Sequence, residues 1–243
     1  TAIRKMESNG DYGWITASGL KEDGTYTNDN NNIDTHLMKN SEWGAVAYLS
    51  KSQYGKNTEE IWKNNGMQYT TGCAGNSVSD YSFDGCQNAY HTPNGVKAST
   101  TGNIYGIYDI SGGSWEMVSA YVDNGHSNLK GNGLSIINAI NKYKDIYAKG
   151  NTDDAPNNYG LAINKKGDAV YETSSNVIPS DLGWFNDFSQ MPNGNNPWFL
   201  RGGGWMLSSG SGSLAGAFNF VRNNGIAGPH NGFRPVLVVN AGL

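Results

Sequence analysis

The sequence predicts an α+β fold with short antiparallel strands, two main helices and many loops. Its 243 residues include 33 glycines, whereas only 16% of them are charged and 12% are aromatic. Few charges together with many aromatic residues and glycines are typical of a packed, loop-rich protein rather than a disordered one. Two stretches have the apolar spacing of helices, and several short β-rich pieces are separated by glycines.

The N-terminal residues 1–35 are polar and rich in asparagine, with one candidate strand around Tyr12–Ala17. The run NDNNNID at 28–34 is similar to a cation-binding loop, but it lacks the glycine and the terminal glutamate of an EF-hand. We therefore expect this run to be a solvated loop.

A first helix is expected to begin at Asn40 or Ser41, either of which can cap it, and to stop near Gly55. Its apolar face carries Trp43, Val46, Ala47 and Leu49. The segment 66–103 that follows is interrupted by glycine, serine and threonine, and we expect it to be irregular.

Both cysteines, Cys73 and Cys86, lie in this irregular segment. No histidine lies between them, so they do not make a zinc site by themselves. We expect them to close a short disulfide loop, which stabilises by about 3 kcal/mol in the chain-entropy model. Two independent thiols are the alternative. A disulfide indicates an oxidising compartment and hence an exported protein.

The middle of the chain predicts two buried strands or closely packed connections, at 104–110 (IYGIYDI) and Trp115–Val122, around a Gly112–Gly113 turn. A second helix is expected over 134–148, with one face formed by Ile136, Ile140, Tyr143 and Tyr147.

The C-terminal section alternates β-rich pieces with glycines: WFLRGGGW, AFNFVR and GFRPVLVV. No repeat or linker divides the chain. We therefore expect a single domain over 1–243, with a polar insertion at about 123–197.

The charge argues against a nucleic-acid-binding surface, and the hydropathy argues against a membrane-spanning helix. The net charge is −4 and the basic residues are dispersed, whereas a nucleic-acid surface needs a basic stripe. No apolar run approaches the roughly 20 residues of a membrane-spanning helix. The chain opens at Thr1 in a polar stretch, so we expect any export or anchoring segment to precede it in the natural protein.

Motifs of catalysis are missing. No serine lies in a G-x-S-x-G elbow, and Gly202–Gly204 is followed by Trp205 instead of the lysine of a P-loop. Glu116 is expected to be a buried structural carboxylate paired with Arg201 or Arg234, the alternative being a general acid. The histidines show no metal-binding spacing, and each is expected on the surface or in a loop: His36, His91, His126 and His230.

Three motifs then occur in one order. They are Glu42–Ala47 (EWGAVA), Asp109–Val118 (DISGGSWEMV) and Leu200–Trp205 (LRGGGW), closed by Gly232–Arg234 (GFR). Together they span roughly 36–239. This arrangement resembles the formylglycine-generating-enzyme-like branch of the C-type lectin fold, whose members carry an E-W helix, a D-M-x-G-N-V-W-E-W segment, an R-G-G-S-W segment and a terminal G-F-R.

The chain departs from the oxidases of that branch. These enzymes use two active-site cysteines between the R-G-G-x-W motif and the G-F-R motif. Residues 206–231 contain no cysteine, and Cys73 and Cys86 do not match those positions. We therefore do not expect the thiol-dependent copper chemistry of these enzymes, or any other enzyme activity.

Within the branch the chain is most similar to the variable proteins of diversity-generating retroelements. The shared pattern is R-G-G-x-W, a stretch rich in serine, glycine and asparagine with aromatics, and then N-G-F-R-P-V. The resemblance implies an adhesin or receptor-binding protein on a cell or virion surface. Its partner would be a protein or glycan on another cell or virion, bound by a variable region at about 204–231.

The set of amino acids that mutagenesis in such systems can produce gives a test of this resemblance. Adenine-directed mutagenesis of asparagine codons cannot produce Lys, Glu, Gln, Trp or Met. None of these five types occurs from Leu207 to Asn231. A glycine-rich and serine-rich loop that merely lacks them is the alternative explanation.

The resemblance implies a division of labour between fixed and variable positions. The expected scaffold is Trp43, Trp115, Glu116, Arg201, Gly202, Gly203, Trp205, Gly232, Phe233 and Arg234. The expected ligand-binding residues point outward: Leu207, Ser209, Ser211, Ser213, Asn219, Val221, Asn223, Ile226, Gly228, Pro229 and His230. Asn219 and Val221 alternate with Phe218 and Phe220, as on a strand with one buried face.

Alternatives remain at this stage. A structural subunit of a surface appendage or virion would use the same region to pack against neighbours. An enzyme of this fold that uses a thiol-independent chemistry, such as an oxygenase with scattered histidine ligands, is a further alternative. No cofactor is implied; structural calcium stays open, because no carboxylate cluster has a convincing ligand spacing. We expect no nucleic-acid partner. Membrane attachment is expected only through a segment outside this chain.

Overall fold

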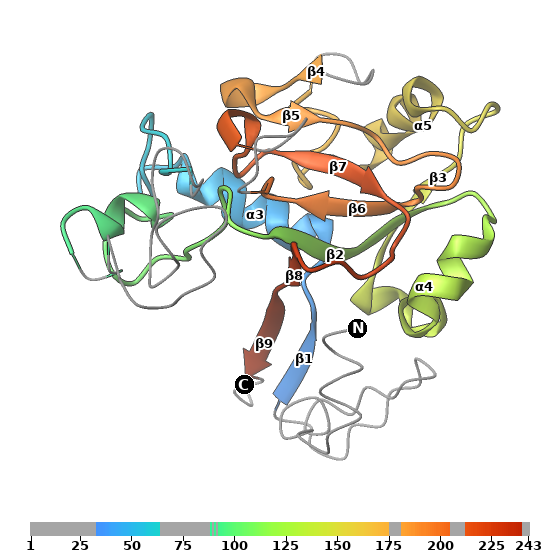
Figure 1. Ribbon diagram of the computed structural model, residues 1–243, viewed down its shortest axis with the longest axis horizontal. Helices are drawn as coiled ribbons and strands as arrows, with labels where there is room; N and C mark the ends of the chain where they lie inside the picture. The colour runs from blue at the N-terminus through green and yellow to red at the C-terminus, as the bar shows by residue number, and fades with distance from the viewer. Residues whose placement is uncertain are drawn as a thin grey trace.

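The computed structural model describes residues 33–63, 88, 90, 92–174, 181–204 and 212–239 (Figure 1). It is a mixed α+β structure with few helices and a curled sheet, as the sequence predicted at this level. The candidate strand at Tyr12–Ala17 and the expected disulfide between Cys73 and Cys86 lie outside these residues.

A seven-stranded sheet forms the centre of the molecule. Its strands are ordered β3 (Asp145–Ala148), β2 (Trp115–Asp123), β6 (Trp198–Arg201), β7 (Phe220–Asn223), β5 (Phe188–Ser189) and β4 (Asp181–Leu182), and β8 (Asn231–Phe233) also pairs with β2. The pairs β2–β6, β6–β7 and β4–β5 are antiparallel, whereas β2–β3, β2–β8 and β5–β7 are parallel. The expectation of antiparallel strands is therefore only partly correct.

A separate two-stranded sheet joins the two ends of the described chain. Strand β1 (Ile33–Leu37) pairs antiparallel with β9 (Pro235–Val239), and Ile33 lies opposite Val239. The pair projects from the body beneath β2 and β8 (Figure 1). The backbone N–H of Met38 also donates to Arg234 O at 2.9 Å, which fastens this pair to the start of the first helix.

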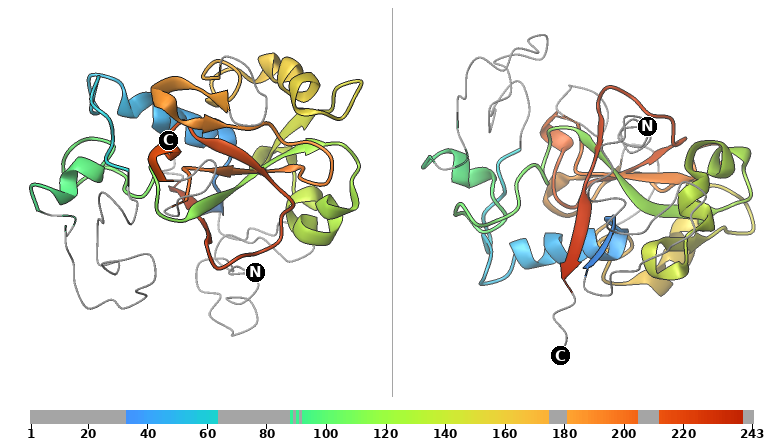
Figure 2. Two further views of the ribbon diagram at one scale, coloured as in Figure 1. Left: turned by 45° about the horizontal axis from the view of Figure 1, so that its top comes forward. Right: turned by 90° about the horizontal axis from the view of Figure 1, so that it is seen from below.

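The first helix, α3 (Asn40–Ser50), forms close to where it was expected and lies across one face of the sheet (Figure 2). The backbone N–H of Lys39 donates to the Glu42 carboxylate at 2.9 Å, which satisfies a donor at the helix start. Trp43 and Ala47 are fully buried, but Leu49 is 58% exposed, so its placement on the apolar face was wrong. Helix α3 ends at Ser50, before the expected stop near Gly55, and Leu49 lies off the helix face formed by the buried residues Trp43, Gly44, Ala47 and Ser50.

The second helix lies earlier in the chain than expected. Helix α4 spans Ser127–Asn138, and the His126 imidazole caps it by accepting a hydrogen bond from Asn128 N at 3.1 Å. A short 3-10 turn, η2 (Asn141–Tyr143), and strand β3 then occupy the rest of the expected helix. The spacing of the isoleucine and tyrosine residues matches a helix, but Tyr147 belongs to strand β3. Its side chain is buried because β3 pairs with β2 in the sheet.

Of the two alternatives for the stretch 104–110, the structure shows a connection and no strand, and the connection is buried only at its end, at Ile110. It forms turns and bends, and Ile104 and Tyr105 are 50% and 89% exposed. Its ends are tied locally, because Thr100 N donates to Ile107 O and Ile107 N donates to Thr100 Oγ1, both at 3.0 Å. These bonds close a loop on itself and leave its backbone without a strand partner.

The other described elements are one short helix and four 3-10 turns. Helix α5 (Ala155–Leu161) lies with α4 beside β3 (Figure 1). The remaining short turns are η1 (Gly95–Ala98), η3 (Ala162–Lys165), η4 (Trp184–Asn186) and η5 (Gly212–Leu214). The segment 123–197 therefore contributes β3, β4 and β5 to the same sheet as the C-terminal strands.

The main core lies between α3 and the sheet. Its largest fully buried side chains are Trp43, Phe199, Phe220, Tyr147 and Ile110. None of the described helices is long and apolar enough to cross a membrane.

Candidate ligand-binding surface

The scaffold is centred on Trp43. Its indole Nε1 donates to Ala217 O at 2.7 Å, which ties α3 to the chain just before β7. The Arg201 guanidinium lies 5.7 Å from the Trp43 ring centroid and 5.7 Å from that of Phe220. The arginine expected in the scaffold is therefore fully buried between two aromatic rings, where cation–π attraction is strongest.

Arg201 donates hydrogen bonds to backbone carbonyls and lies within electrostatic range of the Asp168 carboxyl. Its Nη1 donates to Ala169 O at 3.2 Å and its Nη2 to Asp168 O at 3.4 Å. Burial lowers the pKa of Arg201 to about 10. Burial also raises the pKa of Asp168 to about 6, although the hydroxyl of Tyr147 donates to its carboxylate. A buried charge held this way is costly to leave unpaired.

Glu116 pairs with Arg234, one of the two partners expected for it. The Arg234 Nη2 lies 3.2 Å from Glu116 Oε1 and also donates to Asp109 O at 3.1 Å. Burial raises the pKa of Glu116, and the charge of Arg234 opposes that shift. This ion pair joins β2 to the residue after β8, so the glutamate is placed as a structural group.

The glycine-rich motif brings three backbone segments together. Gly202 and Gly203 have φ of 81° and 78°, the left-handed region that favours glycine. The carbonyl of Gly202 accepts from Gly112 N at 2.9 Å and from Gly216 N at 3.0 Å. Trp205, the last scaffold residue of this motif, lies outside the described residues.

The remaining scaffold residues line the β2–β8 pairing. In the parallel register, Glu116 lies opposite Gly232 and Met117 lies opposite Phe233. Trp115 packs against a small buried cluster of Phe188, Leu200 and Val221. The scaffold residues that the structure describes thus surround β2 and its neighbours.

Two of the expected ligand-binding residues are buried, and their outward orientation was wrong. Asn219 is fully buried and donates through Nδ2 to Leu214 O at 2.8 Å. Val221 is 7% exposed in the cluster with Phe188 and Leu200. The physical reason is that both faces of β7 are covered, because Phe220 packs into the main core and Val221 packs into the cluster with Phe188 and Leu200, so alternation no longer distinguishes them.

The loop 224–230 connects β7 to β8 and is held at several points. Its carbonyl at Asn224 accepts from Asn132 Nδ2 of α4 at 2.7 Å. Gly225 has φ of 86°, and a Cβ there would lie 2.6 Å from the Trp198 ring. At the far end, the carbonyl of His230 accepts from Trp115 N at 3.0 Å. The loop backbone is thus pinned to α4, β6 and β2.

Between these pins the loop exposes its side chains. Ile226 is 57% exposed and Pro229 is also exposed, whereas Gly228 and His230 are half-buried. Asn223 is half-buried too, and its Oδ1 accepts from Gly225 N at 2.7 Å, so its side chain shapes the loop.

The other expected ligand-binding residues do not join this loop in the described structure. Ser213 is exposed but lies on η5, before β7, whereas the loop follows β7 at its other end (Figure 1). Leu207, Ser209 and Ser211 lie outside the described residues. The described part of the predicted surface is therefore centred on the loop 224–230.

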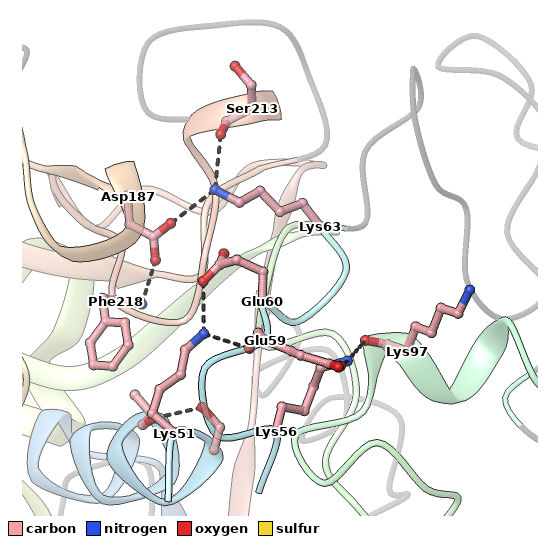
Figure 3. Close-up of polar contacts among 11 residues, drawn as sticks. Lys51, Lys56, Glu59, Glu60, Lys63, Lys97, Asp187, Ser213 and Phe218 are labelled. Atoms are coloured by element: carbon pink, nitrogen blue, oxygen red, sulfur yellow. Dashed lines mark hydrogen bonds and ion pairs between the residues drawn. The ribbon is translucent and has the colours of Figure 1, made fainter.

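A buried ion pair that the sequence did not indicate fixes the start of this region. The carboxylate of Asp187 accepts from Lys63 Nζ at 3.1 Å and from Phe218 N at 3.0 Å, and Lys63 also donates to Ser213 O at 3.0 Å (Figure 3). A Cβ on Gly216 would lie 1.9 Å from Asp187 Oδ1. The carboxylate therefore joins three distant segments.

Burial dominates the electrostatics of this ion pair. It raises the pKa of Asp187 to about 7, and the Lys63 charge opposes the shift, whereas Glu60 adds to it. Asp187 lies in the run WFNDF, which has no motif that could have marked it. Only its spatial partners identify its role.

The other titratable groups do not converge on one centre. Among the described residues, no group of three or more His, Cys, Asp or Glu side chains is placed to hold a metal ion. His36 was expected on the surface or in a loop, but it is buried on β1, where Nε2 lies 2.7 Å from Glu42 Oε1. Strand β1 is covered there by the start of α3, which explains the burial.

No protein family, no curated protein and no solved structure matches the chain.

Proposed function

We propose that the chain is an exported ligand-binding protein of the adhesin or receptor-binding type, with a C-type lectin fold of the formylglycine-generating-enzyme-like branch. The loop 224–230 is its binding surface in the described part. A diversity-generating retroelement varies the exposed residues of this surface, and the protein binds its ligand without catalysis.

One observation carries the proposal. The loop displays Ile226 and Pro229 to solvent, while its backbone is held by Asn132, Trp198 and Trp115 through the contacts described above. Side chains on a pre-organised backbone can change without unfolding the domain, and they lose little conformational entropy when a ligand binds. This combination suits a surface whose sequence varies.

The composition of the loop indicates how it would bind. Residues 224–230 contain no lysine, arginine or carboxylate, and Arg222 just before them donates to the Asn193 side chain. Binding would therefore depend on shape and aliphatic contact more than on charge. The partner would be a protein or glycan at the surface of another cell or a virion.

The gene and its downstream flank provide the first test. We expect a near-copy of the segment encoding 200–234 that differs at adenines and adjoins a reverse-transcriptase gene. Its adenine positions should include the codons of Ile226, Pro229 and His230 and omit those of the scaffold residues Arg201 and Arg234. The lack of such a copy would leave a binding or structural protein of fixed specificity.

A protein-level test uses the triple variant Ile226→Ser, Pro229→Ser, His230→Asn. We expect the variant to lose the natural ligand or exchange it for another, with a melting temperature within a few degrees of the parent. A matched variant, Ile104→Ser with Tyr105→Ser, alters another exposed turn and should keep the ligand. Equal ligand binding by the triple variant and the parent would contradict the proposal.

A further inference from the structure

The buried pair of Lys63 and Asp187 brings an amine and a carboxyl group into contact. Lys63 Nζ lies 3.1 Å from Asp187 Oδ1, and the two side chains are only 16% and 2% exposed. Lys63 follows α3 in the chain, whereas Asp187 directly precedes β5, 124 positions later. Two groups that the fold holds in contact, away from water, react far more readily than the same groups free in solution.

The amine of this pair is held by two acceptors. Lys63 Nζ donates to Ser213 O at 3.0 Å as well as to the Asp187 carboxylate (Figure 3). Ser213 belongs to η5, so the two acceptors come from different segments of the fold. The lysine side chain therefore loses little further conformational entropy when its nitrogen approaches the carboxyl carbon.

The carboxyl group is oriented by a backbone donor and by a glycine. Phe218 N donates to Asp187 Oδ2 at 3.0 Å, whereas Lys63 contacts Oδ1. A backbone N–H placed in this way stabilises the negative charge that develops on Oδ2 when an amine adds to the carboxyl carbon. Gly216 lies directly against the group, because a Cβ there would be 2.1 Å from Asp187 Cγ. The fold therefore encloses the carboxyl group closely.

The surroundings favour the uncharged forms of both groups. Burial raises the pKa of Asp187 to about 7, and the charge of Glu60 adds to this shift, although the charge of Lys63 opposes it. A proton that passes from the Lys63 ammonium to this carboxylate leaves a neutral amine beside a neutral acid. The hollow that Asp187 lines with Ile61 and Phe218 has no room for a water molecule. An amide formed there would be protected from hydrolysis.

We propose that Lys63 and Asp187 form an intramolecular isopeptide bond in the folded protein. The neutral Nζ adds to Asp187 Cγ, while the N–H of Phe218 stabilises the charge on Oδ2. The Nζ–Cγ bond forms and the Cγ–Oδ1 bond breaks. Oδ1 leaves as water with its own proton and one proton from Nζ, and the amide keeps Oδ2 and the other Nζ hydrogen. The step changes no oxidation state and needs no co-reactant.

The bond would join the segment after α3 covalently to the start of β5. This inference goes beyond the proposed function, because neither residue belongs to the loop 224–230 and the bond forms without a ligand. Until it condenses, the pair stays a titratable ion pair, so the stability of the uncondensed chain depends on pH through Asp187.

The test is intact-mass spectrometry of the full chain, dissolved in denaturant from inclusion bodies, refolded, and reduced before each measurement. We expect the mass to fall with time from the sequence value by the mass of one water molecule. Tryptic digestion of the product should give a branched peptide that joins the side chains of Lys63 and Asp187. This peptide distinguishes the isopeptide bond from water loss by cyclisation at the Asp-Gly steps of Asp23 and Asp84.

Lys63→Arg keeps a positive charge beside Asp187 but lacks the primary amine, so this variant should retain its full mass. Lys51→Arg is the matched control, because Lys51 pairs with Glu60 at 2.8 Å and the variant should still lose one water. The triple variant of the loop should also condense, which separates this inference from the proposed function.

A parent chain that keeps its sequence mass after refolding would overturn the inference. So would a branched peptide that contains a different lysine, or the same loss of water in Lys63→Arg as in the parent. If Lys63→Arg does not fold, the presence or absence of the branched peptide in the parent decides alone.

Discussion

The two ends of β7 differ in what their side chains contact. At its start, Asn219 and Val221 are buried, and Arg201 lies under Phe220 with a fixed set of carbonyl partners. At its end, the loop 224–230 is pinned through its backbone and through Gly225, while Ile226 points to solvent. Tolerance to substitution thus depends on whether side chains or backbone atoms make the contacts.

The largest effect is expected from Arg201→Ala. This change removes a guanidinium between two rings and leaves the carbonyls of Ala169 and Asp168 without donors. We expect a loss of about 4 kcal/mol in the free energy of unfolding, measured by urea titration. Arg222→Ala, which removes one contact at the far end of β7, should cost less than about 1 kcal/mol. Similar losses in the two variants would contradict the comparison.

Asparagine substitution at two nearby positions sharpens the contrast. Val221→Asn places an amide in the cluster with Phe188 and Leu200, and we expect a loss of about 3 kcal/mol in the free energy of unfolding. Ile226→Asn changes an exposed side chain and should stay within about 0.5 kcal/mol. Urea titrations of both variants provide the measurement. If Val221→Asn were as stable as Ile226→Asn, Val221 would belong with the exposed positions after all.

The ion pair at the start of the region predicts a pH dependence. The pKa of Asp187 is raised to about 7 in the folded protein from 3.8, so the folded state holds its proton over a wider pH range than the unfolded state. The associated stability is fully present below the unfolded pKa and is lost as the pH rises through about 7. We expect a loss on the order of 2 kcal/mol in the free energy of unfolding between pH 5 and pH 8.

The control for this pH series is Asp187→Asn, which should remove most of the fall. A smaller fall should persist because the pKa of Asp168 is raised to about 6 and acts in the same direction. Stability that rose from pH 5 to pH 8 in the parent would show that Asp187 is ionised in the folded state throughout this range.

Among the four changes that are not controls, the smallest stability effect is expected from Asn132→Ala. The change removes the hydrogen bond from α4 to Asn224 O, at a cost of about 1 kcal/mol in the free energy of unfolding. Amide hydrogen exchange at Ile226 should nevertheless become faster, because the loop loses one of its pins. Asn128→Ala is the matched control, since Asn128 Nδ2 donates to Asn195 O outside the loop. Unchanged exchange in Asn132→Ala would show that the loop does not depend on α4.

Some features of the fold could be predicted because local sequence determines them. The α+β class, the start of α3, the strand from Trp115 and the pairing of Glu116 with Arg234 are confirmed. Each depends on a local pattern or on a restricted choice of partners for a buried charge.

The remainder depended on tertiary contacts that no local pattern reports. The faces of β7 could not be assigned, because the side chains that cover them come from elements far apart in the chain. The sequence position of Tyr147 is compatible with a helix face as well as with strand β3, to which the residue belongs. Asp187 and Lys63 are 124 positions apart, so only folding brings them together. Within the candidate site, the sequence therefore did not separate the buried members from the exposed ones.

The β1–β9 pair also has a mechanical consequence. Because Ile33 and Val239 are register partners, the described chain enters and leaves the molecule at one corner. A load applied between these two residues would separate β1 and β9 one hydrogen bond at a time, starting at that corner. This short ribbon would yield at low force before the seven-stranded sheet carried any load. A protein tethered through this corner would thus have a compliant joint next to a stiff body.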